Sequence, residues 1–164
     1  MSALGHPWLH FALRLALGGY FLYASLDKIA DPVAFARIVY QWQVAGPVPS
    51  NLAALILPWV EALAGVLLIA GIWKREAAAV IAILLLIFIV AAGSVMARGI
   101  DVENCGCVSP AAAAKTGERA WWQGVGWFLV ARNFVLLGAA LVLIRVEPRA
   151  RLAKEATPVP APAP

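Results

Sequence analysis

The stretch AAAVIAILLLIFIVAAGSVMA, residues 77–97, decides the fold class, because it carries no charged side chain from end to end. An apolar run of about 18 or more residues is long enough to cross the hydrocarbon core of a bilayer as a helix. The polar turn Lys74-Arg75-Glu76 separates this run from a second one, residues 52–73. Because so short a connection joins antiparallel neighbours, we expect the two runs to form a membrane-spanning hairpin.

Two further apolar runs, residues 7–26 and 121–144, complete the pattern. The sequence is 63% hydrophobic and 13% charged, whereas soluble domains are about 45–50% apolar and about 25% charged. The first run is longer than the apolar part of a secretory signal and has no Lys or Arg before it, so we expect it to be retained. The predicted fold is an all-α, integral membrane four-helix bundle.

The segments between and after the spans predict one additional helix and a tail. Asp31-Pro32 is typical of a helix start, with Asp as the N-cap and Pro in the first turn, and Gly46-Pro47-Val48-Pro49 is expected to stop that helix. We therefore expect a short interfacial helix between spans one and two. Residues 148–164, rich in Pro and Ala, are expected to form a disordered cytoplasmic tail after a membrane domain of residues 1–147.

The basic residues indicate how the bundle is oriented. The formal net charge is +4, but Lys and Arg gather at the ends of the apolar runs and form no patch interleaved with aromatics, so no nucleic-acid partner is predicted. Four spans put both termini on one side of the bilayer. The basic cluster directly after the last span favours cytoplasmic termini, which places the loop before span four on the extracytoplasmic face.

That loop contains the two cysteines of the chain, in the sequence Cys105-Gly106-Cys107. A disulfide across one residue closes a very small ring, and departure from relaxed geometry makes such a bond easier to reduce. A reactive pair, a structural disulfide and two idle thiols all remain open from the residues alone. No metal site is predicted, because zinc takes about four ligands and the histidines, His6 and His10, lie across the membrane.

Ionisable side chains within the spans are the next candidates. Glu61 and Arg132 each lie about ten residues from the outer end of a span, so both are roughly 15 Å deep, and we expect them to pair. The pair is either structural or part of a proton or quinone site. Tyr20 and Tyr23 share a helix face, and they either line a pocket that opens towards the cysteine loop or are interfacial aromatics.

Four further residues are given supporting roles. Pro58 is expected to kink span two and open space beside Glu61. Lys28, at the end of span one, and Asn133, within span four, are assigned structural roles, as is Pro58. Arg14 is expected to snorkel to the cytoplasmic surface.

Four motifs carry a resemblance to a known family. They are residues 23–28 at the end of span one, Leu57-Pro58-Trp59-Val60-Glu61, Cys105-Gly106-Cys107 and Ala131-Arg132-Asn133. In order and spacing the chain resembles the MauE group of the DoxX-like membrane proteins. The resemblance implies a four-helix protein of the bacterial inner membrane that works with a thioredoxin-like partner in disulfide formation or maturation of exported proteins.

Three functions follow as hypotheses. The first is a thiol–disulfide relay in which Cys105 and Cys107 are catalytic and exchange electrons with the thioredoxin-like protein. A quinone held near Tyr23, Glu61 and Arg132 is the cofactor hypothesised for this relay. The second is a non-catalytic assembly or anchoring subunit with a static disulfide. The third, by likeness to other DoxX relatives, is a quinone-linked subunit for sulfur oxidation.

Overall fold

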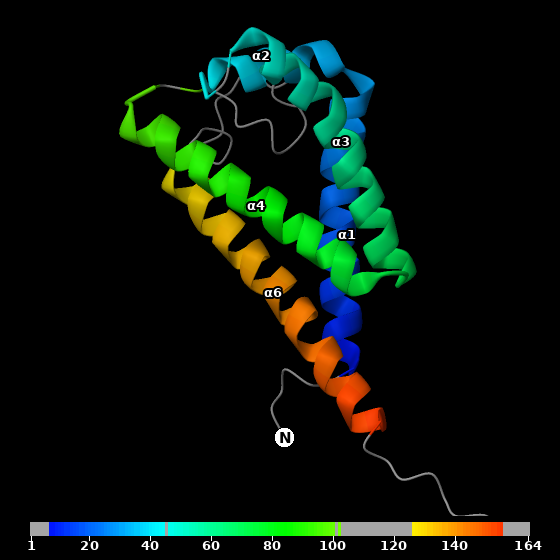
Figure 1. The fold of residues 1–164 in the computed structure, drawn as a ribbon. Coiled ribbons are helices and arrows are strands. Elements are labelled where there is room, and N and C mark those ends of the chain that lie inside the picture. Colours follow the sequence, from blue (N-terminus) through cyan, green and yellow to red (C-terminus); the bar gives the residue numbers. More distant parts are fainter. Residues whose placement is uncertain (1–6, 45, 101, 103–125, 156–164) are drawn as a thin grey trace, which may run out of the picture.

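The computed structural model describes residues 7–44, 46–100, 102 and 126–155, and this part of the chain is helical without strands. Its helices are α1 (Pro7–Ala30), α2 (Pro32–Gln41), α3 (Pro47–Ala70), α4 (Lys74–Ala97) and α6 (Trp127–Glu155). Figure 1 shows four long helices with the short α2 lying across one end of them. The all-α prediction with a short helix between the first two spans is confirmed.

Four of these helices are long and apolar enough to cross a membrane: α1, α3, α4 and the part of α6 from Trp127 to Arg145. Large apolar side chains lie exposed along them, including Leu63 at 62%, Val90 at 71% and Val135 at 73% exposed. A soluble protein rarely leaves so much apolar surface in water. Lipid is therefore the solvent for these faces, and the chain is a multi-pass membrane protein.

The start of α2 follows the sequence prediction. The Asp31 side chain accepts a hydrogen bond from the Ala34 amide at 2.9 Å, and Pro32 occupies the first turn. The same pair of residues ends α1 at Ala30, later than the expected end at residue 26, because a residue before proline is disfavoured in the helical conformation. Lys28 therefore lies inside α1 and not in a loop.

The boundaries of α3 differ from the prediction. The helix begins at Pro47, five residues before the expected start at residue 52, because prolines are tolerated in a first turn, where the amide has no acceptor. It ends at Ala70 because Gly71 adopts φ +77°, and the Gly71 amide donates to the Leu67 carbonyl at 3.0 Å. The hairpin turn is thus Gly71 to Trp73, and the polar residues expected to form the turn begin α4.

The last helix is longer than expected. α6 continues through Pro148 to Glu155, so the predicted boundary at residue 148 is not where the helix ends. Residues 156–164, the remainder of the predicted tail, lie outside the described residues.

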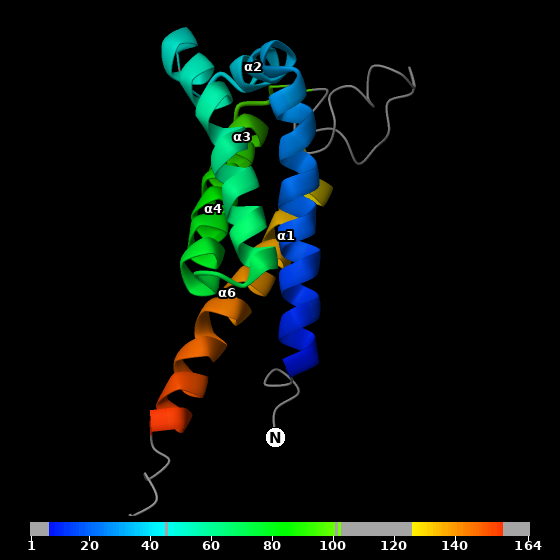
Figure 2. The ribbon, with the colours of Figure 1, turned by 90° about the vertical axis from the view of Figure 1, so that its right-hand side faces the viewer.

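The long helices pack in two pairs, α1 along α3 and α4 along α6. In Figure 2, α6 runs obliquely to α1. A buried cluster joins all four, with Leu17 from α1, Leu68 from α3, Ile81 from α4 and Leu137 from α6 among its members. This cluster is the core of the bundle.

Two glycines let α1 and α3 approach closely. A Cβ atom added to Gly65 would lie 2.8 Å from the Gly18 carbonyl oxygen, and one added to Gly18 would lie 2.9 Å from the Gly65 oxygen. Small residues at a helix crossing allow backbones to touch in a membrane, where dispersion and close packing replace the hydrophobic effect. This crossing fixes the distance between α1 and α3.

Arg14 also joins α1 to α3, and the expectation that it snorkels to the surface is wrong. Its Nε donates to the Leu68 carbonyl at 3.0 Å and its Nη2 to the Ile69 carbonyl at 3.1 Å. The last carbonyls of a helix lack intrahelical donors and carry partial negative charge, so a cation there is favourable. Arg14 is therefore a cap for the C-terminus of α3.

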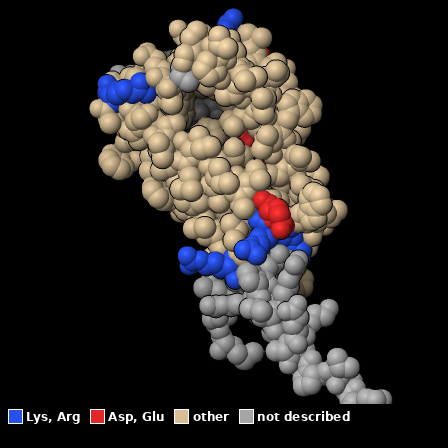
Figure 3. All heavy atoms as spheres, viewed as in Figure 1, with Lys and Arg blue, Asp and Glu red and all other residues tan. Residues whose placement is uncertain are grey.

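The two ends of the bundle differ. The end with α2 also holds the C-terminus of α4 and the start of α6, whereas the N-terminus of α1 and the α3–α4 turn lie at the opposite end (Figure 1). On the face seen in Figure 3, Lys and Arg gather near the two ends, with a largely uncharged zone between them. That zone is the part of the surface suited to the bilayer core.

Candidate functional site

A buried ion pair links α1 and α3. Lys28 Nζ lies 2.6 Å from Glu61 Oε2, and the two residues are only 2% and 1% exposed. The expected pairing of Glu61 with Arg132 is wrong. Equal depth does not place two side chains on facing surfaces, since each helical residue turns the side chain by about 100°.

Two aromatic rings surround the ammonium group of Lys28. Its Nζ lies 5.1 Å from the ring centroid of Phe35 in α2 and 5.7 Å from that of Phe88 in α4. Aromatic faces attract a cation, and they also exclude water from the pair. Removal of one partner from such a pair leaves an uncompensated buried charge, which costs about 3–5 kcal/mol.

A small cavity adjoins the pair. It offers about 20 Å³ to the centre of a water molecule, which is room for about one water. Its polar walls are Lys28, Glu61, Tyr20 of α1 and Asn133 of α6. The Asn133 Nδ2 donates to the Leu129 carbonyl of its own helix at 2.8 Å. A site of this polarity can hold one water that joins α1, α3 and α6.

The other residues of the predicted quinone or proton site are not brought to this cavity. Arg132 lies over the ring of Tyr20, with its Cζ 5.9 Å from the ring centroid. Tyr23 is 57% exposed and is not among the described residues that line this cavity. The pocket that Tyr20 and Tyr23 are expected to line opens towards the cysteine loop, which lies outside the described residues. Pro58 lies buried inside α3, but the cavity beside Glu61 has other residues as its walls.

Cys105 and Cys107 lie outside the described residues. The chain leading to them is anchored at the end of the bundle that carries α2. Val102 is 6% exposed and belongs to a buried cluster with Ile38 and Trp42. Arg98 fixes the end of α4 there, because its Nη1 donates to the Gln43 carbonyl at 2.8 Å and its Nη2 to the Trp42 carbonyl at 2.9 Å.

Sequence reasoning missed the partner of Glu61, although a signal was present. The Asp31-Pro32 cap marks the end of α1, which leaves Lys28 within the helix and in need of a counter-ion. Ser25, three residues earlier, is fully buried and donates to the Leu22 carbonyl at 2.7 Å. Together with Tyr20 and Phe21, these residues mark the inward face of α1, where the counter-ion had to lie.

Comparison with known proteins assigns the chain to a family. The sequence profile of the family described as methylamine utilisation protein MauE matches residues 6–146. The chain is 34% identical over 144 residues to methylamine utilization protein MauE of Paracoccus denitrificans, covering 88% of this chain and 73% of the relative. It is 32% identical over 150 residues to the protein of the same name from Paracoccus versutus, covering 92% and 76%. No solved structure matches. With both the profile and the relatives spanning most of its length, the chain belongs to the MauE family.

Proposed function

We propose that this bacterial membrane protein is a thiol–disulfide relay that exchanges electrons through Cys105 and Cys107 with a thioredoxin-like extracytoplasmic protein. The observation that carries the proposal is the Cys105-Gly106-Cys107 sequence itself, in a chain with no other cysteine. A thiolate of one cysteine attacks the disulfide of the partner and forms a mixed disulfide. The second cysteine then resolves it, so that the partner leaves as a dithiol and the pair becomes oxidised; the reverse sequence reduces the pair.

The anchoring of the chain before the cysteines supports this role. Val102 is buried against α2, and Cys105 follows three residues later. Three residues span at most about 11 Å, so the bundle limits how far the first cysteine lies from the α2 end. With cytoplasmic termini, that end faces the oxidising side of the membrane, where an exported thioredoxin-like protein works.

The buried Lys28–Glu61 pair supports the relay as a structural element. It joins α1 to α3, and its aromatic surroundings come from α2 and α4. The pair thereby connects α1 and α3 with α2 and α4, and α2 is also the helix against which Val102 packs. We assign it a positioning role, with Asn133 and a single water completing the contact to α6.

The biological process we propose is methylamine utilisation, in which the relatives are named. The relay would act there in the maturation of an exported, disulfide-containing protein. In Paracoccus denitrificans cells lacking their own MauE, the wild-type chain should restore growth on methylamine, and the variant with both Cys105→Ser and Cys107→Ser should not.

The direct test is to trap the mixed disulfide. The wild-type protein, oxidised to a Cys105–Cys107 disulfide, should form a covalent complex with a thioredoxin-like protein whose resolving cysteine has been removed, because the remaining thiolate of that protein opens the disulfide. Dithiothreitol should release the complex by reduction. To identify the attacking cysteine, Cys105→Ser and Cys107→Ser are each mixed with the thioredoxin-like protein in its oxidised, disulfide form. Only the variant that keeps the attacking cysteine opens that disulfide and stops at the mixed disulfide, because the second cysteine that would resolve it is absent. Full restoration of growth by the double Ser variant would refute the relay and favour an assembly or anchoring subunit.

A further inference from the structure

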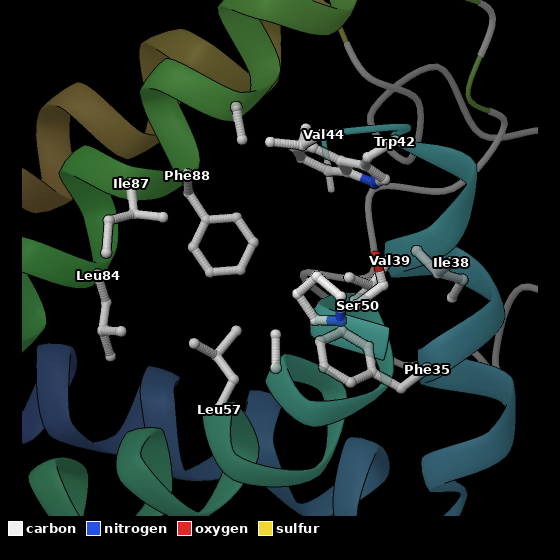
Figure 4. A pocket seen from close by; sticks show the side chains of 13 residues that line it. Phe35, Ile38, Val39, Trp42, Val44, Ser50, Leu57, Leu84, Ile87 and Phe88 are labelled. Carbon is white, nitrogen blue, oxygen red and sulfur yellow. The ribbon is translucent and has the colours of Figure 1, made fainter. Parts of the chain in front are cut away.

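A second cavity lies on the other side of the aromatic wall around Lys28. It occupies about 190 Å³ between α2, α3 and α4. Figure 4 shows Phe88 and Leu84 of α4 on one side of this space. Phe35 of α2 and Trp42, which follows α2, lie on the other side, with Leu57 of α3 below them. Phe35 and Phe88, whose rings contact the Lys28 ammonium, thus also line the cavity.

The cavity continues into an open groove on the surface of the bundle. The groove offers a further space of about 300 Å³ along α3, and four residues line both spaces: Pro49, Ala53, Leu57 and Leu84. The outer rim includes Leu52 and Ile56, which are 56% and 50% exposed on a membrane-spanning helix. The cavity is therefore continuous with the lipid-facing surface of the protein.

The chemistry of the walls decides which ligand fits. Apart from Ser50 and the Trp42 indole, the lining side chains are hydrocarbon, and the Ser50 side chain is buried. The carbonyl groups of a quinone ring would find at most these two donors here, and carbonyl groups that lose hydrogen bonds to water without full replacement are costly to bury. A partner helix, about 10–12 Å across with its side chains, is too thick for this space. A single flexible hydrocarbon chain matches the polarity of the walls and can follow the cavity into the groove.

We propose that the cavity and groove bind one acyl chain of a bilayer phospholipid as a resident structural lipid. The chain enters from the bilayer past Leu52 and Ile56, follows Ala53 and Leu57, and ends between Phe35 and Phe88. It fills the gap between α2 and α4, which otherwise meet through contacts such as that of Trp42 with Phe88, whose ring centroids are 6.1 Å apart. An acyl chain in this position supports the aromatic wall from the side opposite Lys28.

Native mass spectrometry of the full chain tests the proposal. The protein is first stripped of loosely bound lipid and is then released from a mild detergent in the spectrometer. The wild-type protein should retain one phospholipid. Ala53→Trp fills the junction of cavity and groove and should reduce the retained phospholipid at least tenfold. Leu63→Trp is the matched control, because Leu63 is 62% exposed on the same helix but does not line either space, and it should retain the lipid.

Labelling in membranes gives a second readout that does not depend on the folding of a variant. A phosphatidylethanolamine with a photoreactive diazirine at the end of one acyl chain, incorporated into vesicles with the wild-type protein, should label Leu84 and Phe88 inside the cavity. Labelling confined to outward-facing residues such as Leu63 would overturn the proposal. So would an adduct with the mass of a quinone in place of a phospholipid, or retention of the lipid by a folded Ala53→Trp variant.

Discussion

Lys28 and Glu61 face each other across the α1–α3 interface, with 2.6 Å between Nζ and Oε2 and almost no exposed surface on either residue. Ionisable side chains in membrane spans are costly and are retained where they are paired. The position of this pair, enclosed by rings of α2 and α4, makes it the point at which the tertiary structure depends most on two individual residues.

Removal of one charge should therefore destabilise the protein much more than removal of both charges. We expect Lys28→Met to lower the free energy of unfolding by about 3–5 kcal/mol, because Glu61 stays buried without its counter-ion, and the double variant with Glu61→Met to recover most of this loss. Unfolding in mild detergent measures both. Arg75→Met, at an exposed position in the first turn of α4, is the control. A double variant no more stable than either single variant would contradict the pairing.

Because α1 and α3 cross so closely, a single methyl group added at the crossing should destabilise the protein. Gly65→Ala places a Cβ 2.8 Å from the Gly18 oxygen, and the resulting backbone shift should destabilise the protein by about 1–3 kcal/mol. Gly93→Ala in α4 meets no atom within 4 Å and should leave stability unchanged or raise it by up to about 1 kcal/mol. Equal thermal stability of the two variants would show that the helices do not touch at Gly65.

The stability of the protein should depend on the geometry of the Arg14 guanidinium group as well as on its charge. Arg14→Met removes the hydrogen bonds to the Leu68 and Ile69 carbonyls and should cost about 2–3 kcal/mol. Arg14→Lys keeps the charge but not the planar fork, so we expect an intermediate loss. Hydrogen exchange at the C-terminus of α3 should increase in the same order. A Met variant as stable as the wild type would instead agree with a side chain that snorkels to the surface.

The cap of α2 offers a local test. Asp31→Ala removes the acceptor for the Ala34 amide and should destabilise the helix by about 1 kcal/mol, whereas Asp31→Asn should be nearly neutral, because Asn caps as well as Asp. The measurement is hydrogen exchange of the α2 amides. Faster exchange in the Asn variant than in the Ala variant would be inconsistent with this cap.

Much of the fold could be predicted from the sequence, because hydropathy over long windows and local capping are properties of neighbouring residues. Residues 77–97 and the Asp31-Pro32 cap gave a span and a helix start that the structure confirms. The partner of Glu61 could not be found by depth alone, since depth says nothing about the direction in which a side chain points. A span-one boundary drawn too early also left Lys28 outside the helix in the prediction.

Other features depend on contacts between helices that no single segment encodes. The role of Arg14 requires the end of α3 beside it, and the Gly18–Gly65 crossing requires two backbones at contact distance. Cys105 and Cys107 are a different case, because their proposed role rests on the sequence and on family membership.

The most direct test of the relay is a redox titration of Cys105 and Cys107 in native membranes, with free thiols counted by a mass tag at each poised potential. A working pair should convert from two thiols to none in one reversible two-electron transition, with a slope of about 30 mV per tenfold change in the oxidised-to-reduced ratio. The midpoint should lie above about −300 mV, within the range of thiol–disulfide exchange proteins. Cysteines that stay reduced throughout, or a disulfide that resists reduction below that potential, would contradict the account.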